Sequence, residues 1–503
     1  MTMDTIARIN DAVRSVIWGV PMLILLVGTG VYFTLRTGLF QVRRIRLWLG
    51  RTVLSCFGDK ARRAGGISPF ATMCTALAAT VGTGNIAGVA TALTIGGPGA
   101  VFWMWVAAFF GMMTAFAENT LGMLYREKGP DGAWRGGPMF YLKKGLHAPM
   151  LAAAFALFCA LASFGIGNMS QCNSIAGGLH GVFGVPPLVT GLVTAALLGA
   201  VMLGGLGRIS RVTTTLVPAM ALFYMGGAAV VLWCRRDFLP QACGQILACA
   251  FDLRAAGGGA VCFGMQQAIR IGISRGVFSN EAGLGSSVMV HTAADANEPC
   301  EQGMWAVFEV FFDTIVMCTV TALVILSSGV YDPTQYGLAA GTPLLLRLET
   351  GAALTARAFS AVFGAPGGAF VAMSLALFAF STLLGWSYYG QRAAEYLFGP
   401  RVVPLYKGLF VAAAAAGCVM RLDLAWALSD TFNGLMALPN LAGVLALRRD
   451  VLGEWRRYRR AHHMNLQFLL FSPLFPSQIA QISVFCLKKT FLALSIVPFA
   501  DRI

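Results

Sequence analysis

Apolar residues recur along the chain in runs long enough to cross a lipid bilayer, separated by short polar connections. The bilayer core requires about 20 mostly apolar residues in a helix, and backbone groups in lipid must be paired within the spanning structure. The pattern therefore predicts an all-α polytopic membrane protein. We predict eleven transmembrane helices, at residues 16–37, 67–95, 99–125, 149–179, 186–205, 212–234, 258–285, 302–328, 357–390, 402–420 and 424–447.

No long polar segment separates these runs, which predicts one transmembrane domain over residues 1–464. The first run resembles a signal peptide because Arg8 and Arg14 precede it. Its length and the basic residues that follow it are typical of a stop-transfer helix, so we interpret it as an extra amino-terminal helix. Residues 465–503 are apolar, contain prolines and are split by two lysines. We predict an atypical C-terminal tail there and assign it no function.

Composition supports the membrane interpretation, since 57% of residues are hydrophobic, 12% are charged and the mean hydropathy is +0.69. The formal net charge of +15 comes from Lys and Arg concentrated in the connections after the first, third, fifth, ninth and eleventh spans. Cytoplasmic connections retain such residues, which predicts an outside amino terminus and a cytoplasmic carboxyl terminus in the cell inner membrane. Because the basic residues are spread over several connections, we expect no nucleic-acid partner.

The twelve cysteines lie mainly in apolar spans and none has the C-x-x-C spacing. We therefore expect neither a disulfide nor a cysteine metal site. Residues 67–234 and 258–447 each contain five predicted helices, so the second group starts from the opposite face of the membrane. This is the inverted repeat of many secondary transporters. The first helices of the two groups share an N-x-A-G pattern, at 85–88 and 280–283, and we predict that both of these helices are interrupted.

The stretch TVGTGNIAG, at 80–88, places glycines and polar residues in the middle of a predicted span. Glycine lowers helix stability by about 1 kcal/mol relative to alanine, which predicts an interruption here. Exposed backbone at membrane depth is tolerated where it lines a cavity or meets a ligand, and half-helix ends attract substrate anions and cations. The alternative is close helix packing through small residues. The polar Thr80, Thr83 and Asn85 at the same depth favour the site.

Charged residues also lie at membrane depth in the second group. Such residues mark either a transport pathway or a buried ion-pair scaffold. We interpret Arg275 and Glu281 as scaffold, because an arginine beside an ion-binding carboxylate would already neutralise it. Glu309 and Asp313 are spaced i,i+4 and could balance the arginines from one helix face.

Several blocks of the chain resemble the alanine or glycine:cation symporter family, also known as sodium:alanine symporters. They are GGPGAVFWMWVAAFFGM at 96–112, GTGNIAG at 82–88, GNMSQCNSIAGGL at 167–179 and RGVFSNEAGLGS at 275–286. The resemblance extends over about residues 10–460. It implies a leucine-transporter-type fold with one extra amino-terminal helix, which imports a small neutral amino acid such as alanine or glycine together with Na⁺.

The resemblance also implies which residues form the substrate site. Thr83, Gly84 and Asn85 match the interrupted segment that receives the substrate carboxylate. Gln171 matches a glutamine that holds the polar end of the substrate, and Trp386 matches a wall of the side-chain pocket. The further positions implied to contact the substrate are Thr382, Ile269 and Gly272.

For Na⁺, the resemblance implies hydroxyl oxygens of Ser381 and Thr382 facing the interrupted helix at Thr80 and Gly82. It implies no organic cofactor and no catalytic residues. Three alternatives to sodium symport stay open at this point: proton coupling through Glu118, Glu281 or Asp313, a membrane-embedded enzyme, and a passive channel. The five histidines form no recognisable catalytic motif, and a Walker-type sequence is absent, so neither an enzyme nor ATP drive is favoured.

Overall fold

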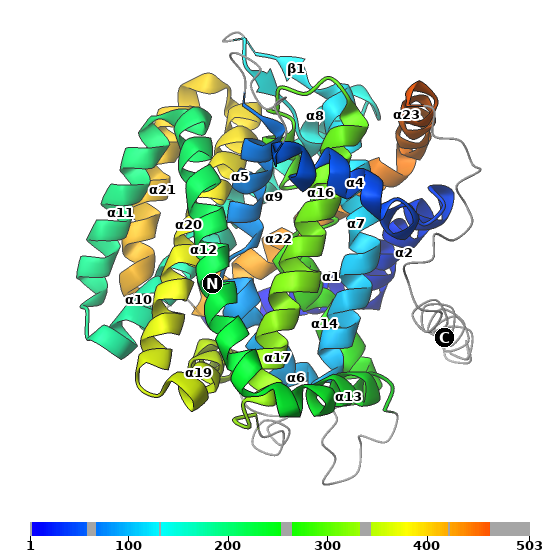
Figure 1. Cartoon of the computed structure of the whole chain (residues 1–503). Helices are drawn as coiled ribbons and strands as arrows, with labels where there is room; N and C mark the ends of the chain where they lie inside the picture. Colours follow the sequence, from blue (N-terminus) through cyan, green and yellow to red (C-terminus); the bar gives the residue numbers. More distant parts are fainter. Residues whose placement is uncertain are drawn as a thin grey trace. The chain divides into compact units, whose positions relative to one another are not determined.

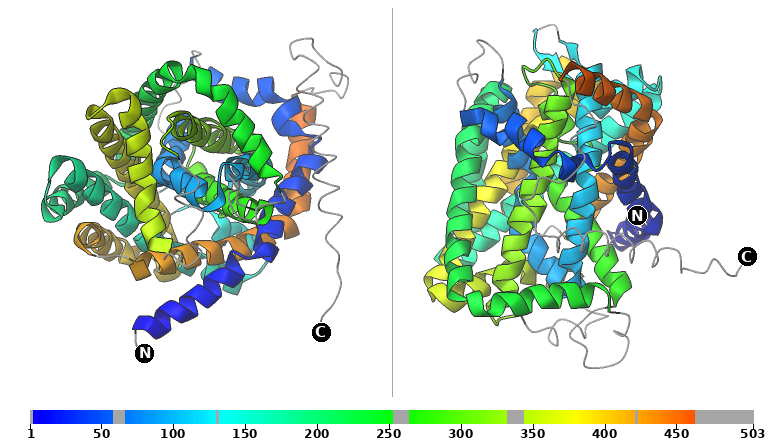
Figure 2. Two further views of the ribbon diagram at one scale, coloured as in Figure 1. Left: turned by 90° about the horizontal axis from the view of Figure 1, so that it is seen from below. Right: turned by 45° about the vertical axis from the view of Figure 1, so that its right-hand side comes forward.

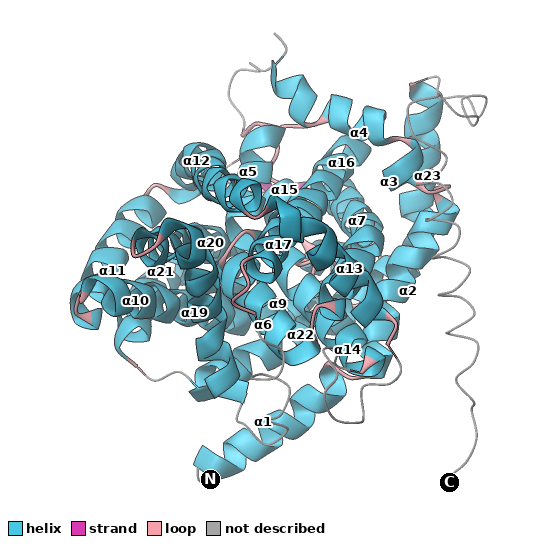
Figure 3. Ribbon diagram, turned by 60° about the horizontal axis from the view of Figure 1, so that its bottom comes forward, coloured by secondary structure: helices cyan, strands magenta, loops and turns pink. Residues whose placement is uncertain are grey.

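The computed structural model describes residues 3–57, 67–129, 132–252, 264–331, 344–420 and 423–462, so the predicted tail at 465–503 lies outside the described residues. The chain divides into a unit of Met1–Trp455, which contains every element of the candidate site, and a unit of Arg456–Ile503. The described residues are almost entirely helical (Figure 3), and their only sheet is the hairpin of β1 (Glu127–Lys128) and β2 (Trp134–Arg135).

Seven helical segments among the described residues are long and apolar enough to cross a membrane. They are Arg8–Arg36, Gly99–Tyr125, Pro149–Phe183, Gly205–Cys234, Pro299–Ser327, Pro366–Phe398 and Pro400–Val419. An eighth span is formed if the bent pair Pro69–Thr80 and Gly84–Gly96 crosses as one unit. The remaining predicted spans correspond to the helices α11 (Pro187–Leu203), α14 (Met265–Asn280) and α22 (Asp423–Ala446). The count of eleven therefore stays a prediction.

The following elements form these segments or connect them. In chain order they are α1 (Met3–Ile17), α2 (Val20–Arg36), α3 (Phe40–Arg43), α4 (Ile45–Arg51), η1 (Val53–Phe57), α7 (Gly99–Tyr125), α8 (Pro138–Lys144), α9 (Pro149–Phe164), η3 (Gly165–Met169), α10 (Ser170–Phe183), α12 (Gly205–Cys234), η4 (Arg236–Phe238), α13 (Leu239–Ala250), α16 (Pro299–Val310), η5 (Phe311–Cys318), α17 (Thr319–Ser327), η6 (Pro400–Val402), α21 (Val403–Val419) and α23 (Arg448–Ala461).

The predicted helix at 357–390 is wrong in its boundaries. The chain forms two helices here, α19 (Leu344–Phe363) and α20 (Pro366–Phe398). Gly364 lies between them with a φ of +67°, a left-handed conformation that commonly ends helices at glycine. Pro366 lacks a backbone N–H and is suited to the first turn of the next helix. A continuous apolar pattern concealed this break.

Both predicted first helices of the two groups are interrupted. In the first, α5 (Pro69–Thr80) ends before residues 81–83, and the chain resumes as a wide π-helical turn, η2 (Gly84–Gly88), followed by α6 (Val89–Gly96). The two halves are bent by 51°. In the second, α14 ends at Asn280, and a non-helical stretch leads to the short helix α15 (Val288–His291). Each N-x-A-G pattern thus lies at a helix interruption.

The connections alternate between the two ends of the unit Met1–Trp455. In Figure 1, α4, the β1-β2 hairpin and α8 lie at the end where α5 is drawn, whereas α13 and α19 lie at the end where α6 is drawn. The right-hand view of Figure 2 shows α13 running across that second end instead of along the bundle. The segments around 43–51 and 126–144, both rich in Lys and Arg, therefore share one end, as an alternating topology requires.

One expectation about cysteines is wrong. Cys249, in α13, is disulfide-bonded. The helix lies at the end opposite the basic connections (Figure 1), which is the end that the charge pattern predicts to be outside. Disulfides persist in oxidising compartments such as the periplasm, so the bond agrees with the predicted outside location of this end.

Candidate functional site between the interrupted helices

A small polar cavity lies where the first interrupted helix meets five other helical elements. Its volume is about 20 Å³, little more than the space of one water. Seven residues that the sequence singled out line it together: Thr80, Gly82, Thr83, Gly84, Gln171, Thr382 and Trp386. They come from α5, the break, η2, α10 and α20, so positions about 300 residues apart in the chain converge on one space.

The predicted ion ligands lie together beside the end of α5. The Ser381 hydroxyl donates hydrogen bonds to the carbonyl oxygens of Phe378 at 2.8 Å and Ala78 at 3.1 Å. The Thr382 hydroxyl faces Gly82 so closely that a Cβ added to this glycine would lie 2.4 Å from it. The last carbonyls of a helix have no partner within the helix. Hydroxyl and carbonyl oxygens are therefore gathered at one place.

Trp386 forms one wall of the cavity and is 3% exposed. Its ring lies against Gly167 in η3, where an added Cβ would be 2.4 Å from the Cβ and Cγ atoms of the tryptophan. The indole Nε1 donates a hydrogen bond of 2.9 Å to Oε1 of Glu281. The indole is thus held by α20, by the glycine beside it and by the carboxylate after α14, which fixes the size of the space in front of it.

Asn85, which the sequence predicts to contact substrate, is not among the residues that line this cavity. Its Nδ2 donates to Oδ1 of Asp313 at 2.7 Å and to the Asp313 carbonyl at 3.1 Å, while its Oδ1 accepts from the Gly82 backbone N–H at 3.0 Å. Asp313 also accepts hydrogen bonds from Ser279 and Thr314, both at 2.8 Å. The amide therefore joins the first break to α14 and η5, and its position supports the shape of the break.

Ile269 and Gly272 are likewise not among the residues that line the cavity. Gly272 packs against α7, where an added Cβ would lie 2.4 Å from the Ala100 carbonyl oxygen. Their placement follows from the position of the second break. Because α14 continues to Asn280, the part of this segment that reaches the cavity lies later, at Phe278 and Glu281.

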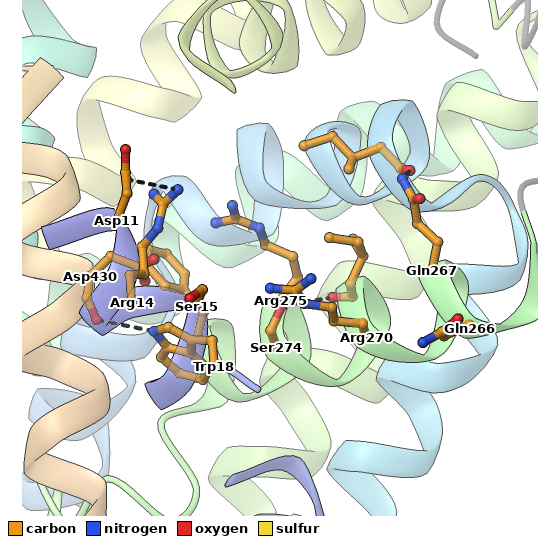
Figure 4. Close-up of a pocket in the computed structure, with 13 residues that line it drawn as sticks. Asp11, Arg14, Ser15, Trp18, Gln266, Gln267, Arg270, Ser274, Arg275 and Asp430 are labelled. Carbon is orange, nitrogen blue, oxygen red and sulfur yellow. Dashed lines mark hydrogen bonds and ion pairs between the residues drawn. The ribbon is translucent and has the colours of Figure 1, made fainter. Parts of the chain in front are cut away.

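The proposed ion-pair scaffold is also wrong. Glu281 faces the cavity and accepts hydrogen bonds from Trp386 and Ser286. Arg275 lines a separate, larger cavity of about 520 Å³, with Asp430 and Arg14 nearby. Figure 4 shows Arg275 among the residues that line that space. Phe278 lines both cavities, and the Arg275 guanidinium lies 5.5 Å from its ring centre.

The other two carboxylates do not balance arginines either. Glu309 accepts from Nε2 of His291 at 2.9 Å, and Asp313 is bonded as described above. Residues four positions apart on one helix share a face, as predicted for Glu309 and Asp313. Their bonding partners, however, come from neighbouring helices, and the sequence pattern does not show which helices are neighbours.

Sequence reasoning missed five residues that line the cavity: Ala79, Ile166, Phe278, Glu281 and Asn433. Glu281 could have been found from the second N-x-A-G pattern, because the first N-x-A-G pattern lies at a helix break. Phe278 precedes that pattern by two positions. Asn433 is one of two asparagines in a span that was not matched to any block, so no sequence signal identified it.

Fold and cavity together define a multi-pass membrane protein with a small polar site between two interrupted helices, an arrangement suited to transport across the bilayer. The chain belongs to the sodium:alanine symporter family, whose model matches residues 3–469. Membership places it among cation-coupled amino-acid symporters.

Two curated relatives cover nearly the whole chain. The sodium/alanine symporter AgcS of Methanococcus maripaludis is 45% identical over 460 residues, which are 91% of this chain and 98% of that protein. The probable sodium/glutamine symporter GlnT of Bacillus subtilis is 36% identical over 89% of each chain. Among solved structures, a Na⁺-coupled sialic acid symporter is similar over 89% of this chain and 85% of that one, with 14% identity and a TM-score of 0.43.

Proposed function

We propose that this protein imports alanine or glycine together with Na⁺ across the cell inner membrane. The observation that carries this proposal is the convergence of both helix interruptions on one buried cavity lined by hydroxyls, amides and the ends of half-helices. Backbone left unpaired at membrane depth needs a ligand or a cavity. Half-helix amino ends attract a substrate carboxylate, while half-helix carboxyl ends coordinate cations.

The carboxylate of the amino acid would bind at the start of the Gly84–Gly96 helix. Thr83 precedes the first turn of this helix and lines the cavity with Gly84. Unpaired N–H groups and the helix dipole favour an anion at such an amino end. Gly84 carries no side chain, which leaves the backbone open to close approach by the carboxylate.

Na⁺ would bind beside the carboxyl end of α5. The oxygens available there are the hydroxyls of Ser381 and Thr382, the Thr80 hydroxyl and carbonyls close to Gly82. Small hard cations prefer oxygen ligands. An ion at this position would link α5 to α20 and hold the first break against the second group of helices, so that Na⁺ and the amino acid favour the same conformation.

The walls of the pocket favour a small substrate. Trp386, Ile166 and Phe278 are its large apolar wall residues. A cavity of about 20 Å³ admits an amino acid only when these walls move apart, and a longer side chain requires a larger movement. The relative GlnT is named as a probable glutamine symporter, and glutamine has a longer side chain than alanine. Substrate size therefore needs a direct test.

Transport would proceed by alternating access around this site. The two groups at 67–234 and 258–447 would form the inverted repeats that rock against each other, with 16–37 as an extra helix. The amino terminus would be outside and the carboxyl terminus cytoplasmic, since the basic connections share one end of the bundle.

The test is uptake of radiolabelled alanine, glycine and glutamine into proteoliposomes, with and without an inward Na⁺ gradient. We expect concentrative uptake of alanine or glycine that requires Na⁺ and persists with a proton uncoupler. Uptake that survives removal of Na⁺ and is abolished by the uncoupler would replace Na⁺ by protons. Flux that never exceeds the external concentration would indicate a channel.

A further inference from the structure

The segment that follows α2 carries positive charge that the protein does not balance. Residues 36–57 contain five arginines and neither a lysine nor an acidic residue. Two of the five have partners within the chain, since Arg51 pairs with Glu301 at 3.2 Å and Arg44 makes a further interaction. The other three are exposed and form no ion pair with any residue that the structure describes: Arg36, Arg43 and Arg46. The segment therefore presents three arginines to an external partner.

The short helices α3 and α4, which carry two of these arginines, are anchored by buried side chains. Nε2 of Gln41 donates to the Thr34 hydroxyl at 3.0 Å and to the Phe109 carbonyl at 3.3 Å. The Trp48 indole, on a side chain 1% exposed, donates to the Gln41 carbonyl at 3.1 Å. These bonds attach both short helices to α2 and α7 (Figure 3). Because the backbone is already fixed, binding a ligand here orders few additional groups.

The neighbouring face of α2 is apolar and exposed. Val20, Ile24 and Leu35 are 60%, 63% and 60% exposed, and their spacing places them on one face of the helix. The opposite face packs closely on α7, where a Cβ added to Gly30 would lie 2.3 Å from the Phe110 carbonyl oxygen. Arg36 directly follows Leu35 at the end of the apolar face. An apolar helix face that ends in arginines matches the two parts of a phospholipid, the acyl chains and the charged headgroup.

We propose that Arg36, Arg43 and Arg46 bind the phosphate of an anionic phospholipid in the cytoplasmic leaflet, with its acyl chains along the exposed face of α2. A guanidinium group binds phosphate oxygens through two parallel hydrogen bonds. Anionic lipids of the cytoplasmic leaflet attract basic clusters that lie directly beyond a transmembrane helix. This inference goes beyond the proposed function, because it relies on the predicted topology and not on the identity of the transported amino acid.

The apolar face of α2 distinguishes a lipid from a soluble phosphate. A soluble phosphate ester would gain only contacts with exposed arginines, which salt screens. A phospholipid adds burial of the apolar surface at Val20, Ile24 and Leu35. One bound lipid would also link α2 to α3 and α4, and through Gln41 to α7. We therefore expect the lipid to raise the thermal stability of the protein.

The wild-type protein provides the first test. The thermal stability of the purified full chain in detergent is measured as dioleoylphosphatidylglycerol is added. Dioleoylphosphatidylcholine is the control lipid, because it has the same acyl chains and a zwitterionic headgroup. We expect the anionic lipid to stabilise the protein at a concentration roughly tenfold lower or more, and glycerol phosphate alone to have no effect. Equal stabilisation by the two lipids, or by glycerol phosphate, would overturn the proposal.

The second test uses the double variant Arg43→Gln/Arg46→Gln. We expect the phosphatidylglycerol concentration for half-maximal stabilisation to rise by roughly 25-fold, at about fivefold for each arginine, while stability without lipid is unchanged. Arg211→Gln/Arg401→Gln is the matched control, because it removes the same charge from exposed arginines in other predicted cytoplasmic connections. The control should respond like wild type. Equal losses in the two double variants would indicate a general attraction of charge and overturn the site.

Failure of the lipid site is distinguishable from failure of the proposed function. Lipid binding is measured without transport, so a lack of Na⁺-dependent uptake would overturn the proposed function and leave the lipid site standing. A wild-type response to phosphatidylglycerol in Arg43→Gln/Arg46→Gln would overturn the lipid site alone. If the double variant does not fold, the single variant Arg43→Gln and the comparison of the two lipids on the wild-type chain still decide.

Discussion

Nδ2 of Asn85 lies 2.7 Å from Oδ1 of Asp313, and this contact ties the turn after the first helix break to η5. Both side chains are completely buried. The same amide accepts a hydrogen bond from the Gly82 backbone N–H at 3.0 Å. One side chain therefore bridges two residues of the first break and also bonds the second group of helices. Asn85 thus supports the shape of the site without lining the cavity.

The first prediction concerns this contact. Asn85→Leu removes the donor and leaves a buried carboxylate short of one partner, a change that costs about 1–3 kcal/mol or more for a charged group. We expect alanine uptake in proteoliposomes to be lost and thermal stability to fall. Asn173→Leu is the control, because Asn173 makes only long bonds, of 3.3 and 3.4 Å, near the end of α21. Normal transport by Asn85→Leu would contradict the supporting role.

The second prediction concerns the ion ligands. In Gly82→Ala the new Cβ would lie 2.4 Å from the Thr382 hydroxyl, which must move away from the break. Overpacking of this kind typically costs 1–3 kcal/mol, so we expect the Na⁺ concentration for half-maximal uptake to rise by about tenfold. Gly88→Ala lies in the same motif and meets nothing within 4 Å. Equal Na⁺ dependence in the two variants would place the ion elsewhere.

The third prediction concerns pocket size. Gly167→Ala places a Cβ 2.4 Å from the Cβ and Cγ atoms of Trp386, which pushes the indole into the cavity. We expect alanine uptake to fall more than glycine uptake, measured as the ratio of the two transport efficiencies. Trp386→Ala removes the wall and the donor to Glu281, and we expect loss of uptake. Gly177→Ala, also near α10 but with nothing within 4 Å, should leave the ratio unchanged.

The fourth prediction concerns a buried network beside the site. His291 contacts Oε2 of Glu309 through Nε2 at 2.9 Å and Nε2 of Gln302 through Nδ1 at 2.6 Å, and that glutamine donates to Thr72 at 3.0 Å. The network joins α15, α16 and α5. His291→Leu leaves Glu309 buried without this partner, so we expect a loss of about 1–3 kcal/mol in unfolding free energy or a marked fall in thermal stability. His180→Leu, at an exposed position, should show little change.

The sequence by itself determined the membrane class, most helix positions and both interruptions. These features depend on local composition: the length of an apolar run relates directly to bilayer thickness, and clustered glycine and polar residues weaken a helix wherever it packs. The resemblance of several short blocks to one family predicted the family of the chain. The match to the family model and the similarity to AgcS confirm that prediction. Seven of the candidate site residues also meet at one cavity, as predicted.

Tertiary structure alone decided which way the polar side chains face. Asn85 and Glu281 occupy corresponding regions of the two N-x-A-G segments, yet the first binds Asp313 behind the break and the second lines the cavity. Asn433 joins the site only because α22 packs beside η3 and places it there. Contacts between distant helices depend on the packing of whole surfaces, and no local pattern along the chain contains that information.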